Sequence, residues 1–407
     1  MSDIEDRLRA ELWAQAQRTQ EEDLRELRVP PRPAPAAARR RWWLAPAGAA
    51  LAVAAVVGVL AGVRGTSGQQ APPAADSGPP PFYVTVPDTG NSGHPDATIR
   101  ATATGATVGR VSVPGTHFGY VAAAADDRTF VLAAYRPPTG TGGNRHGSTE
   151  FYRLTLSASG RPEPLARLPL VVPDSQWASG PSSMALSADG ATLALAVVPS
   201  VVTQQPGAPS ARIEVVSLRT GLTRTWTARR QTAVESLSWV RRGTLAFLVS
   251  GPPAPAGGYQ LRFLDTARPA GGLARASAPV ALRGTAGPLL SALVTGHGHV
   301  VVAWTRAPAR KGQVGNAVLA EFSAQTGRRL RVLDTLLSRG AFESYAQVWS
   351  ADPSGDHVLA GGNTATGQVT QGGIVKGLVL RGVLDRIDRG RVTALPDPGG
   401  LTLAAAW

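Results

Sequence analysis

Six histidines have the most versatile side-chain chemistry in this chain: His94, His117, His146, His297, His299 and His357. His297 and His299 are separated by one residue, so on a β-strand both side chains would lie on one face and could bind a metal ion. However, Gly298 between them is typical of a turn, and no carboxylate lies nearby in the sequence. We therefore interpret these two histidines, and His357 at the matching place later in the chain, as turn residues rather than metal ligands.

Asp126 and Asp127 are the second candidate, because paired carboxylates can act as general acid and base. Adjacent residues of a β-turn point apart, however, and a similar turn recurs as Ala188-Asp189-Gly190. The motifs G-x-S-x-G, S-x-x-K and H-E-x-x-H are missing from the sequence, as are a Walker loop, a dinucleotide fingerprint and calcium-loop spacing. A Ser-His-Asp triad assembled only by folding stays open. The sequence thus indicates no catalytic, cofactor-binding or metal-binding residue, and no enzyme.

Composition excludes several further classes of site. The chain has 407 residues and no cysteine, which rules out disulfides, thiol nucleophiles, iron–sulfur clusters and cysteine zinc sites. Lys+Arg exceed Asp+Glu by 41 to 28, giving a net charge of +13. Aromatic residues are not interleaved with the basic ones as in a nucleic-acid stacking platform, so nucleic acid is not expected as a partner. Acidic wall polymers, phospholipid headgroups or an acidic protein suit this charge better.

Residues 42–63 determine on which side of a membrane any such site would lie. They form 22 residues without a charge, and a helix of that length spans about 33 Å, enough for a bilayer core of about 30 Å. Arg39, Arg40 and Arg41 precede the segment and favour a cytoplasmic N-terminus. A cleaved signal peptide and a buried core helix are the alternatives, but the cleavage site would be poor. We predict a signal anchor that crosses the cell membrane once and leaves the C-terminal domain extracellular.

A tail and a linker flank the predicted membrane helix. Residues 1–41 form a cytoplasmic tail with an amphipathic helix over about residues 3–18 and a possible second one over Glu21–Arg28. This tail would bind a cytoplasmic protein, for instance a sigma factor, or remain a solvated helix without a partner. Residues 64–81 are rich in Gly, Pro, Ala and Ser and are expected to form an extended linker.

Residues 82–407 have the pattern of an all-β domain built from repeats. Short apolar runs are separated by turns that recur at intervals, and one strand of each repeat begins near Phe130, Leu193, Leu245, Val300 and Val358. These positions are 52 to 63 residues apart, which is the length of a four-stranded propeller blade. Two β-sandwiches are the alternative.

The ends of this domain predict how a ring would close. The sixth repeat stops at Trp407 one strand short, whereas a surplus strand at residues 81–86 precedes the first repeat. An N-terminal strand that completes the last blade would remove both open sheet edges. The sequence predicts six blades, with seven as the alternative. Trp239, Trp349 and Trp407 occupy equivalent places of the repeat and are expected to pack between neighbouring blades rather than to bind a cofactor.

Two stretches carry a resemblance to a known family: Ile213–Val249 and Met184–Ala194. They resemble degenerate blades of WD-repeat and TolB-type β-propellers, and the whole chain resembles actinobacterial membrane proteins with a short tail, one helix and such a propeller. The Gly-His and Trp-Asp marks of the strict WD repeat are missing, so no blade tetrad is assigned. The resemblance implies an interaction scaffold for an envelope protein or wall ligand. A transmembrane signalling regulator and a propeller hydrolase are the alternatives.

Overall fold

The computed structural model describes residues 78–87, 96–137, 147–173, 180–198, 210–229, 232–250, 259–285, 287–295, 297–306, 316–336, 345–369, 375–389, 391–395 and 402–407. The predicted tail, the membrane segment 42–63 and most of the linker lie outside these residues and stay predictions. Among the described residues, no helix has the length and apolar character needed to cross a membrane.

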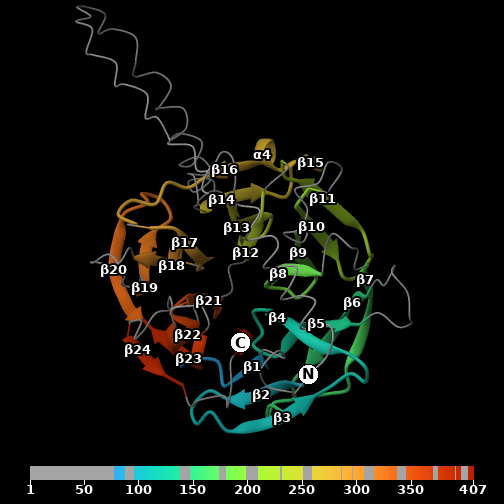
Figure 1. The fold of residues 1–407 in the computed structure, drawn as a ribbon. Coiled ribbons are helices and arrows are strands. Elements are labelled where there is room, and N and C mark those ends of the chain that lie inside the picture. Colours follow the sequence, from blue (N-terminus) through green and yellow to red (C-terminus); the bar gives the residue numbers. More distant parts are fainter. Residues whose placement is uncertain are drawn as a thin grey trace, which may run out of the picture. The chain divides into compact units, whose positions relative to one another are not determined.

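Six antiparallel sheets form a closed ring, the six-bladed β-propeller that the sequence predicts (Figure 1). From the innermost strand outward, blade 1 comprises β25 (Thr402–Ala406), β1 (Phe82–Pro87), β2 (Ala97–Ala101) and β3 (Thr107–Val111). Blade 2 comprises β4 (His117–Ala123), β5 (Thr129–Arg136), β6 (Ser148–Thr155) and β7 (Ala166–Pro173). Blade 3 comprises β8 (Pro181–Leu186), β9 (Thr192–Val197), β10 (Arg212–Ser217) and β11 (Thr223–Thr227).

The remaining three blades follow the same order. Blade 4 comprises β12 (Val234–Arg241), β13 (Thr244–Ser250), β14 (Tyr259–Asp265) and β16 (Ser277–Pro279). Blade 5 comprises β17 (Leu289–Val294), β18 (His299–Arg306), β19 (Asn316–Ser323) and β20 (Arg329–Leu336). Blade 6 comprises β21 (Tyr345–Ala351), β22 (His357–Val369), β23 (Val375–Asp388) and β24 (Arg391–Ala394). Each innermost strand contacts the innermost strand of the next blade, and β25 contacts both β21 and β4. Seven blades and two sandwiches are thereby excluded.

The closing blade differs from the prediction in the share that each end of the chain contributes. β1 pairs with β25, with Val84 opposite Ala406, so the two chain ends do meet in one sheet. However, the C-terminus supplies only the innermost strand, and the N-terminal segment supplies the other three. The predicted closure by an N-terminal strand is confirmed, but this strand is the second of the closing blade, and it does not complete that blade alone. The sequence repeat begins at the third strand of one blade and ends at the second strand of the next, so each repeat is divided between two blades.

The antiparallel order of the strands gives the ring two unlike ends. Turns between the first and second strands, such as residues 124–128 and 187–191, open on the same end as turns between the third and fourth strands, such as residues 218–222. We call this end the turn face. β1 begins at Phe82 on this face, and the chain ends there at Trp407. The opposite end carries the connections between second and third strands and between blades, and we call it the loop face.

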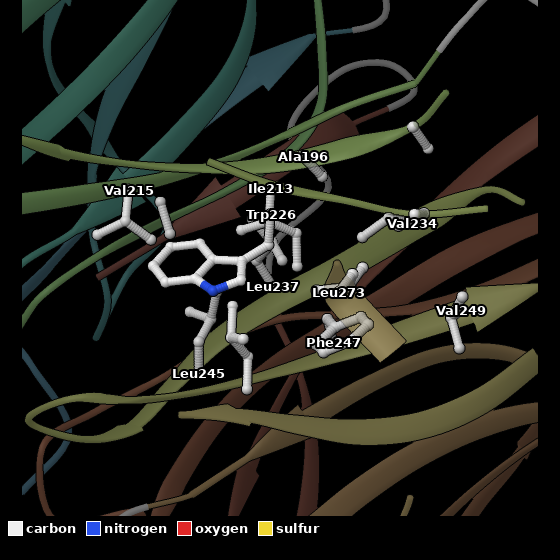
Figure 2. Packing of buried hydrophobic residues seen from close by; sticks show 14 of the residues in the cluster. Ala196, Ile213, Val215, Trp226, Val234, Leu237, Leu245, Phe247, Val249 and Leu273 are labelled. Carbon is white, nitrogen blue, oxygen red and sulfur yellow. The ribbon is translucent and has the colours of Figure 1, made fainter. Parts of the chain in front are cut away.

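The core lies between blades, where side chains from facing sheets pack together. The largest of these clusters joins blades 3 and 4 around Trp226, whose side chain is fully buried (Figure 2). Its indole Nε1 donates to Pro269 O at 3.1 Å. The short helix α4 (Leu273–Ala276) adds Leu273 to the cluster, and the two-residue strand β15 (Gly271–Gly272) pairs with the outer strand β11 of blade 3. A segment of blade 4 therefore covers the open edge of blade 3.

The predicted packing role of the three equivalent tryptophans is confirmed. Trp239 packs against the cluster between blades 3 and 4, while Trp349 and Trp407 belong to the cluster between blades 6 and 1. Trp239 Nε1 also donates to Ala185 O of the neighbouring blade at 3.1 Å. These residues lie in or directly after the innermost strands, because the repeat straddles two blades.

Inner-strand serines hold several neighbouring blades together by hydrogen bonds. Ser182 Oγ donates to Val234 O at 2.9 Å, and Ser183 Oγ accepts the N–H of Leu237 at 2.9 Å. Ser291 Oγ donates to Val348 O and accepts its N–H, both at 3.2 Å. Leu237 lies where the register of β12 against β13 shifts, so its N–H is free of the strand ladder and needs this partner.

Candidate functional site

The structure gives three predicted turn histidines carboxylate partners that the sequence did not reveal. His297 Nε2 lies 3.8 Å from Asp356 Oδ1, and the His299 ring contacts Glu321. His357 is buried, and its Nδ1 lies 2.7 Å from Asp388 Oδ1. The expectation that no carboxylate lies near His297 and His299 holds only along the sequence, because their partners come from the next blade and the next strand. His297 lies in the predicted turn, whereas His299 and His357 are the first residues of strands β18 and β22 rather than turn residues. Among the described residues, no group of three metal-binding side chains is assembled.

Asp126 and Asp127 lie together on the turn face of blade 2, but only Asp126 acts as the expected turn residue. Its carboxylate accepts the backbone N–H groups of Arg128 at 3.0 Å and Thr129 at 2.8 Å, as well as the Thr129 hydroxyl at 2.6 Å. Desolvation opposes ionisation of this group, yet the hydrogen bonds prevail and hold the pKa of Asp126 below its ordinary value. Asp126 therefore stabilises the turn.

Asp127 has the opposite environment. Desolvation, followed by the charges of Asp352 and Asp126, raises the pKa of Asp127 from 3.8 to about 6, against the opposing charges of Arg128 and His357. Its Oδ1 is buried and has no hydrogen-bond partner among the described residues. Asp352 and His357 belong to blade 6, so the carboxyl of Asp127 is influenced by a blade that is not its neighbour in sequence. We call Asp127, Asp352, His357 and Asp388 the polar cluster.

The backbone at Asp127 is strained as well. Its φ is 56°, in the left-handed region that favours glycine and that aspartate and asparagine tolerate better than most other residues. Measured from the first apolar residue after each turn, Asp127 occupies the place of Gly190 in blade 3 and Gly355 in blade 6, whose φ values are 66° and 73°. Glycine would satisfy the turn at lower cost, so the fold does not explain why a carboxylate stands here.

Three other buried carboxylates of the ring, Glu150, Glu321 and Asp352, have partners that account for them, whereas desolvation and then the charge of Asp334 raise the pKa of the buried Asp385 to about 6. Glu150 is 6% exposed and accepts hydrogen bonds from Arg136, Arg167 and the Tyr152 hydroxyl. Hydrogen bonds from Arg136 and then Tyr152 hold the pKa of Glu150 below its ordinary value. Asp352 is 7% exposed and accepts the N–H of His357 at 3.0 Å. Asp127 thus stands apart as a carboxyl with an unpaired buried oxygen.

The closing interface beside the polar cluster contains further unpaired groups. Tyr83 Oη, Trp349 Nε1 and Trp407 Nε1 are buried and make no hydrogen bond within the described part of the chain. All three residues belong to the apolar cluster between blades 6 and 1. Unpaired polar atoms are uncommon in folded proteins and are typical of places that serve a purpose besides stability. Chemically, the polar cluster can hold a proton or a cationic group next to the ring centre.

Sequence reasoning found Asp126 and Asp127 but treated them alike, and it did not connect them with Asp352 or Asp388. One signal was present: Asp127 stands where two other repeats have glycine. No pattern along the chain links Asp127 to Asp352, since they meet only through closure of the ring.

Several solved propeller structures are similar to this chain. A protein assigned as TolB in Agrobacterium tumefaciens has 13% identity and a TM-score of 0.41, covering 78% of this chain and 88% of that one. The periplasmic gluconolactonase of Pseudomonas aeruginosa has 15% identity and a TM-score of 0.44, covering 80% and 98%. A prolyl endopeptidase has 11% identity and a TM-score of 0.42, covering 80% and 50%.

These similarities concern the propeller fold, which the chain shares with TolB and other propeller proteins. At such identities, no residue role is transferred from them. No protein-family model and no curated protein matches the chain.

Proposed function

We propose that this protein is a membrane-anchored binding scaffold whose propeller stands outside the cell membrane and holds a cationic group of its ligand at the polar cluster. The observation that carries this proposal is Asp127: a residue with positive φ at a glycine position, with a buried carboxyl oxygen that has no hydrogen-bond partner among the residues the structure describes. Folding alone gains nothing from this arrangement, whereas a bound cation would pair the oxygen and relieve its repulsion with Asp352.

The ligand class follows from charge. Asp127 and Asp352 repel each other, and a primary ammonium or guanidinium placed between them would stabilise both ionised forms. Such groups occur on envelope proteins and on amine-bearing wall components. The rigid ring would bind such a ligand at one fixed position. A rigid fold that presents a binding site in this way acts as an interaction scaffold.

The binding test uses simple cationic probes. Cadaverine and agmatine at pH 7.5 are expected to raise the melting temperature of the full chain, and Asp127→Asn should weaken their binding at least tenfold, because it removes one of the two charges. Asp189→Asn is the matched control, since Asp189 lies on the equivalent turn of blade 3 and is exposed. Equal binding by the wild type and Asp127→Asn would overturn the proposed ligand site.

The anchor and its orientation have a separate test. The chain lacks cysteine, so single cysteines can be introduced at Ser2 and at Leu222, which is 72% exposed on the turn face. A membrane-impermeant maleimide is expected to label Leu222→Cys in intact cells, but Ser2→Cys only after lysis. Labelling of both sites or of Ser2→Cys alone in intact cells would contradict the proposed topology.

A hydrolase is the second candidate function, and the His357–Asp388 pair favours it. A histidine oriented by a carboxylate at 2.7 Å, beside a carboxyl whose pKa is about 6, is typical of general acid–base catalysis near neutral pH. Glucono-1,5-lactone and p-nitrophenyl acetate are suitable probes. If this function is correct, turnover falls at least 100-fold in both His357→Gln and Asp127→Asn. Hydrolysis at the buffer rate would exclude it for these substrate classes.

A further inference from the structure

The outer edge of blades 5 and 6 carries an unusual concentration of arginines on the turn-face side. We call Arg283, Arg328, Arg329, Arg331, Arg389 and Arg391 the arginine edge; all six are exposed. The fold brings them together from three segments. Residue 283 forms a parallel bridge with residue 328, and Arg331 Nη1 donates to Arg389 O at 2.7 Å.

Only part of this charge is neutralised within the protein. Arg331 pairs with Glu321 at 2.6 Å, and Arg389 pairs with Asp356 at 3.1 Å. Among the described residues, no carboxylate pairs with the other four arginines. The arginine edge therefore presents an excess of positive charge, which attracts anionic surfaces.

Exposed aliphatic side chains alternate with these arginines on the outermost strand of blade 5. Leu330 and Val332 of β20 are each 49% exposed, and they stand between and beside Arg329 and Arg331. Leu330 is the additional residue of a β-bulge, because Arg329 and Arg331 pair with the consecutive residues Phe322 and Glu321. Arginine heads with aliphatic groups between them suit the interface of a bilayer, where charge meets headgroups and the aliphatic groups meet the acyl boundary.

The proposed membrane anchor would bring a bilayer within reach of this edge. The predicted membrane helix ends at residue 63, and β1 begins at Phe82 on the turn face. The linker of residues 64–81 spans roughly 55 Å when extended and about 25 Å as a flexible chain. A tether of that length holds the bilayer at a high effective concentration, so even a modest attraction produces docking.

We propose that the arginine edge docks the propeller onto the anionic surface of the bilayer in which the chain is anchored. This inference rests on the proposed membrane anchor. Within the polar cluster, Asp127 and Asp352 lie on the turns that follow the innermost strands β4 and β21, away from the outermost strand β20 of blade 5. Lipid headgroups and other anionic surfaces offer the same phosphate or carboxylate groups to these arginines. The experiment below distinguishes anionic lipid from an acidic polypeptide.

The experiment measures the approach of blade 5 to lipid in the full chain. A fluorophore on Leu330→Cys is compared with one on Val171→Cys, which is 46% exposed on β7, the outermost strand of blade 2. The chain is reconstituted into phosphatidylcholine vesicles with or without phosphatidylglycerol, and nitroxide lipids serve as quenchers. Quenching is expected at position 330 only, only with phosphatidylglycerol, and is expected to disappear in high salt.

Charge removal supplies the decisive variant. Each arginine near an anionic surface contributes about fivefold to docking, so substituting Arg283, Arg328 and Arg329 by Gln should lower the docked-to-free ratio about 100-fold. The matched control substitutes Arg110, Arg161 and Arg219, which are exposed on blades 1 to 3, and should leave quenching unchanged. Equal quenching at positions 330 and 171, no dependence on phosphatidylglycerol, or an equal loss in the control variant would overturn the inference.

Two further results would distinguish the anchor from the arginine edge and lipid from an acidic polypeptide. A chain that does not float with phosphatidylcholine vesicles lacks the anchor, and docking is then decided by flotation with phosphatidylglycerol vesicles, where binding that the triple variant loses supports the arginine edge. A fluorophore at position 330 that responds to soluble polyglutamate and not to anionic vesicles would overturn lipid docking in favour of an acidic polypeptide.

Discussion

The interface between blades 3 and 4 and the interface that closes the ring between blades 6 and 1 are built differently. Around Trp226, the buried polar atoms have partners: its indole donates to Pro269 O, and the N–H of Leu237 is accepted by Ser183. In the closing interface, Tyr83 Oη, Trp349 Nε1 and Trp407 Nε1 are buried without a partner among the described residues. The first interface is arranged for stability. The second contains unpaired buried polar atoms, which lower the stability of the fold, and it adjoins the polar cluster.

This contrast agrees with where strain is found. The blade 3–4 interface is reinforced by α4 and β15, which blade 4 places over its neighbour. The closing interface adjoins Asp127, a residue with positive φ and a carboxyl whose pKa is raised to about 6. Regions that a protein keeps despite their cost are typical of functional sites. If this contrast between the two interfaces is correct, substitutions in the blade 3–4 interface lower stability more than substitutions in the closing interface.

Trp226→Ala should break the stable interface. Removing a fully buried indole leaves a cavity between blades 3 and 4, and the free energy of unfolding is expected to fall by about 3 to 5 kcal/mol. Urea denaturation measures the change. Leu222→Ala is the control, because Leu222 is 72% exposed and should change stability by less than about 0.5 kcal/mol. Similar losses in both variants would refute the importance of this cluster.

Ser183→Ala should weaken the same interface by a smaller amount. It leaves the N–H of Leu237 without the 2.9 Å hydrogen bond that joins blades 3 and 4. We expect a loss of about 1 to 3 kcal/mol in the free energy of unfolding, because a buried donor becomes unpaired. The exposed Ser159→Ala is the control. A loss no greater than that of the control would show that the serine contact does not hold the blades together.

Asp127→Asn should stabilise the closing interface in a pH-dependent way. Because the folded-state pKa is raised from 3.8 to about 6, the ionised carboxylate destabilises the fold increasingly from pH 4 to pH 6 and fully above it. Asn keeps the shape and tolerates positive φ, so the variant should exceed the wild type by about 1 to 3 kcal/mol at pH 8 and match it near pH 4. Melting curves across this pH range provide the measurement. A variant less stable than the wild type at pH 8 contradicts the assignment.

Trp349→Phe should have the smallest effect. Its indole N–H makes no hydrogen bond to any residue that the structure describes, so its removal forfeits only packing at a partly buried ring. We expect a cost at least about 1 kcal/mol lower than that of Trp226→Phe, which also leaves Pro269 O without its donor. Chemical denaturation of the two variants side by side decides this point. Equal costs would remove the distinction between the two interfaces.

The local elements of this protein could be predicted from its amino-acid sequence. Turn residues such as Gly160 and Gly221, separated by short apolar runs, predicted an all-β chain of six repeats, and the recurring tryptophans predicted packing between blades. These features follow from backbone sterics and short-range periodicity, which each repeat expresses independently.

The way in which the two chain ends share a blade, and the charged residues that come together, depend on the folded ring. Three strands rather than one come from the N-terminal end, because a repeat can be divided between two blades without any change in its local pattern. His357 contacts Asp388 of the neighbouring strand, and the charge of Asp352 in blade 6 raises the pKa of Asp127 in blade 2. Electrostatic interactions depend on distance in space, and ring closure brings together residues that no spacing along the chain connects.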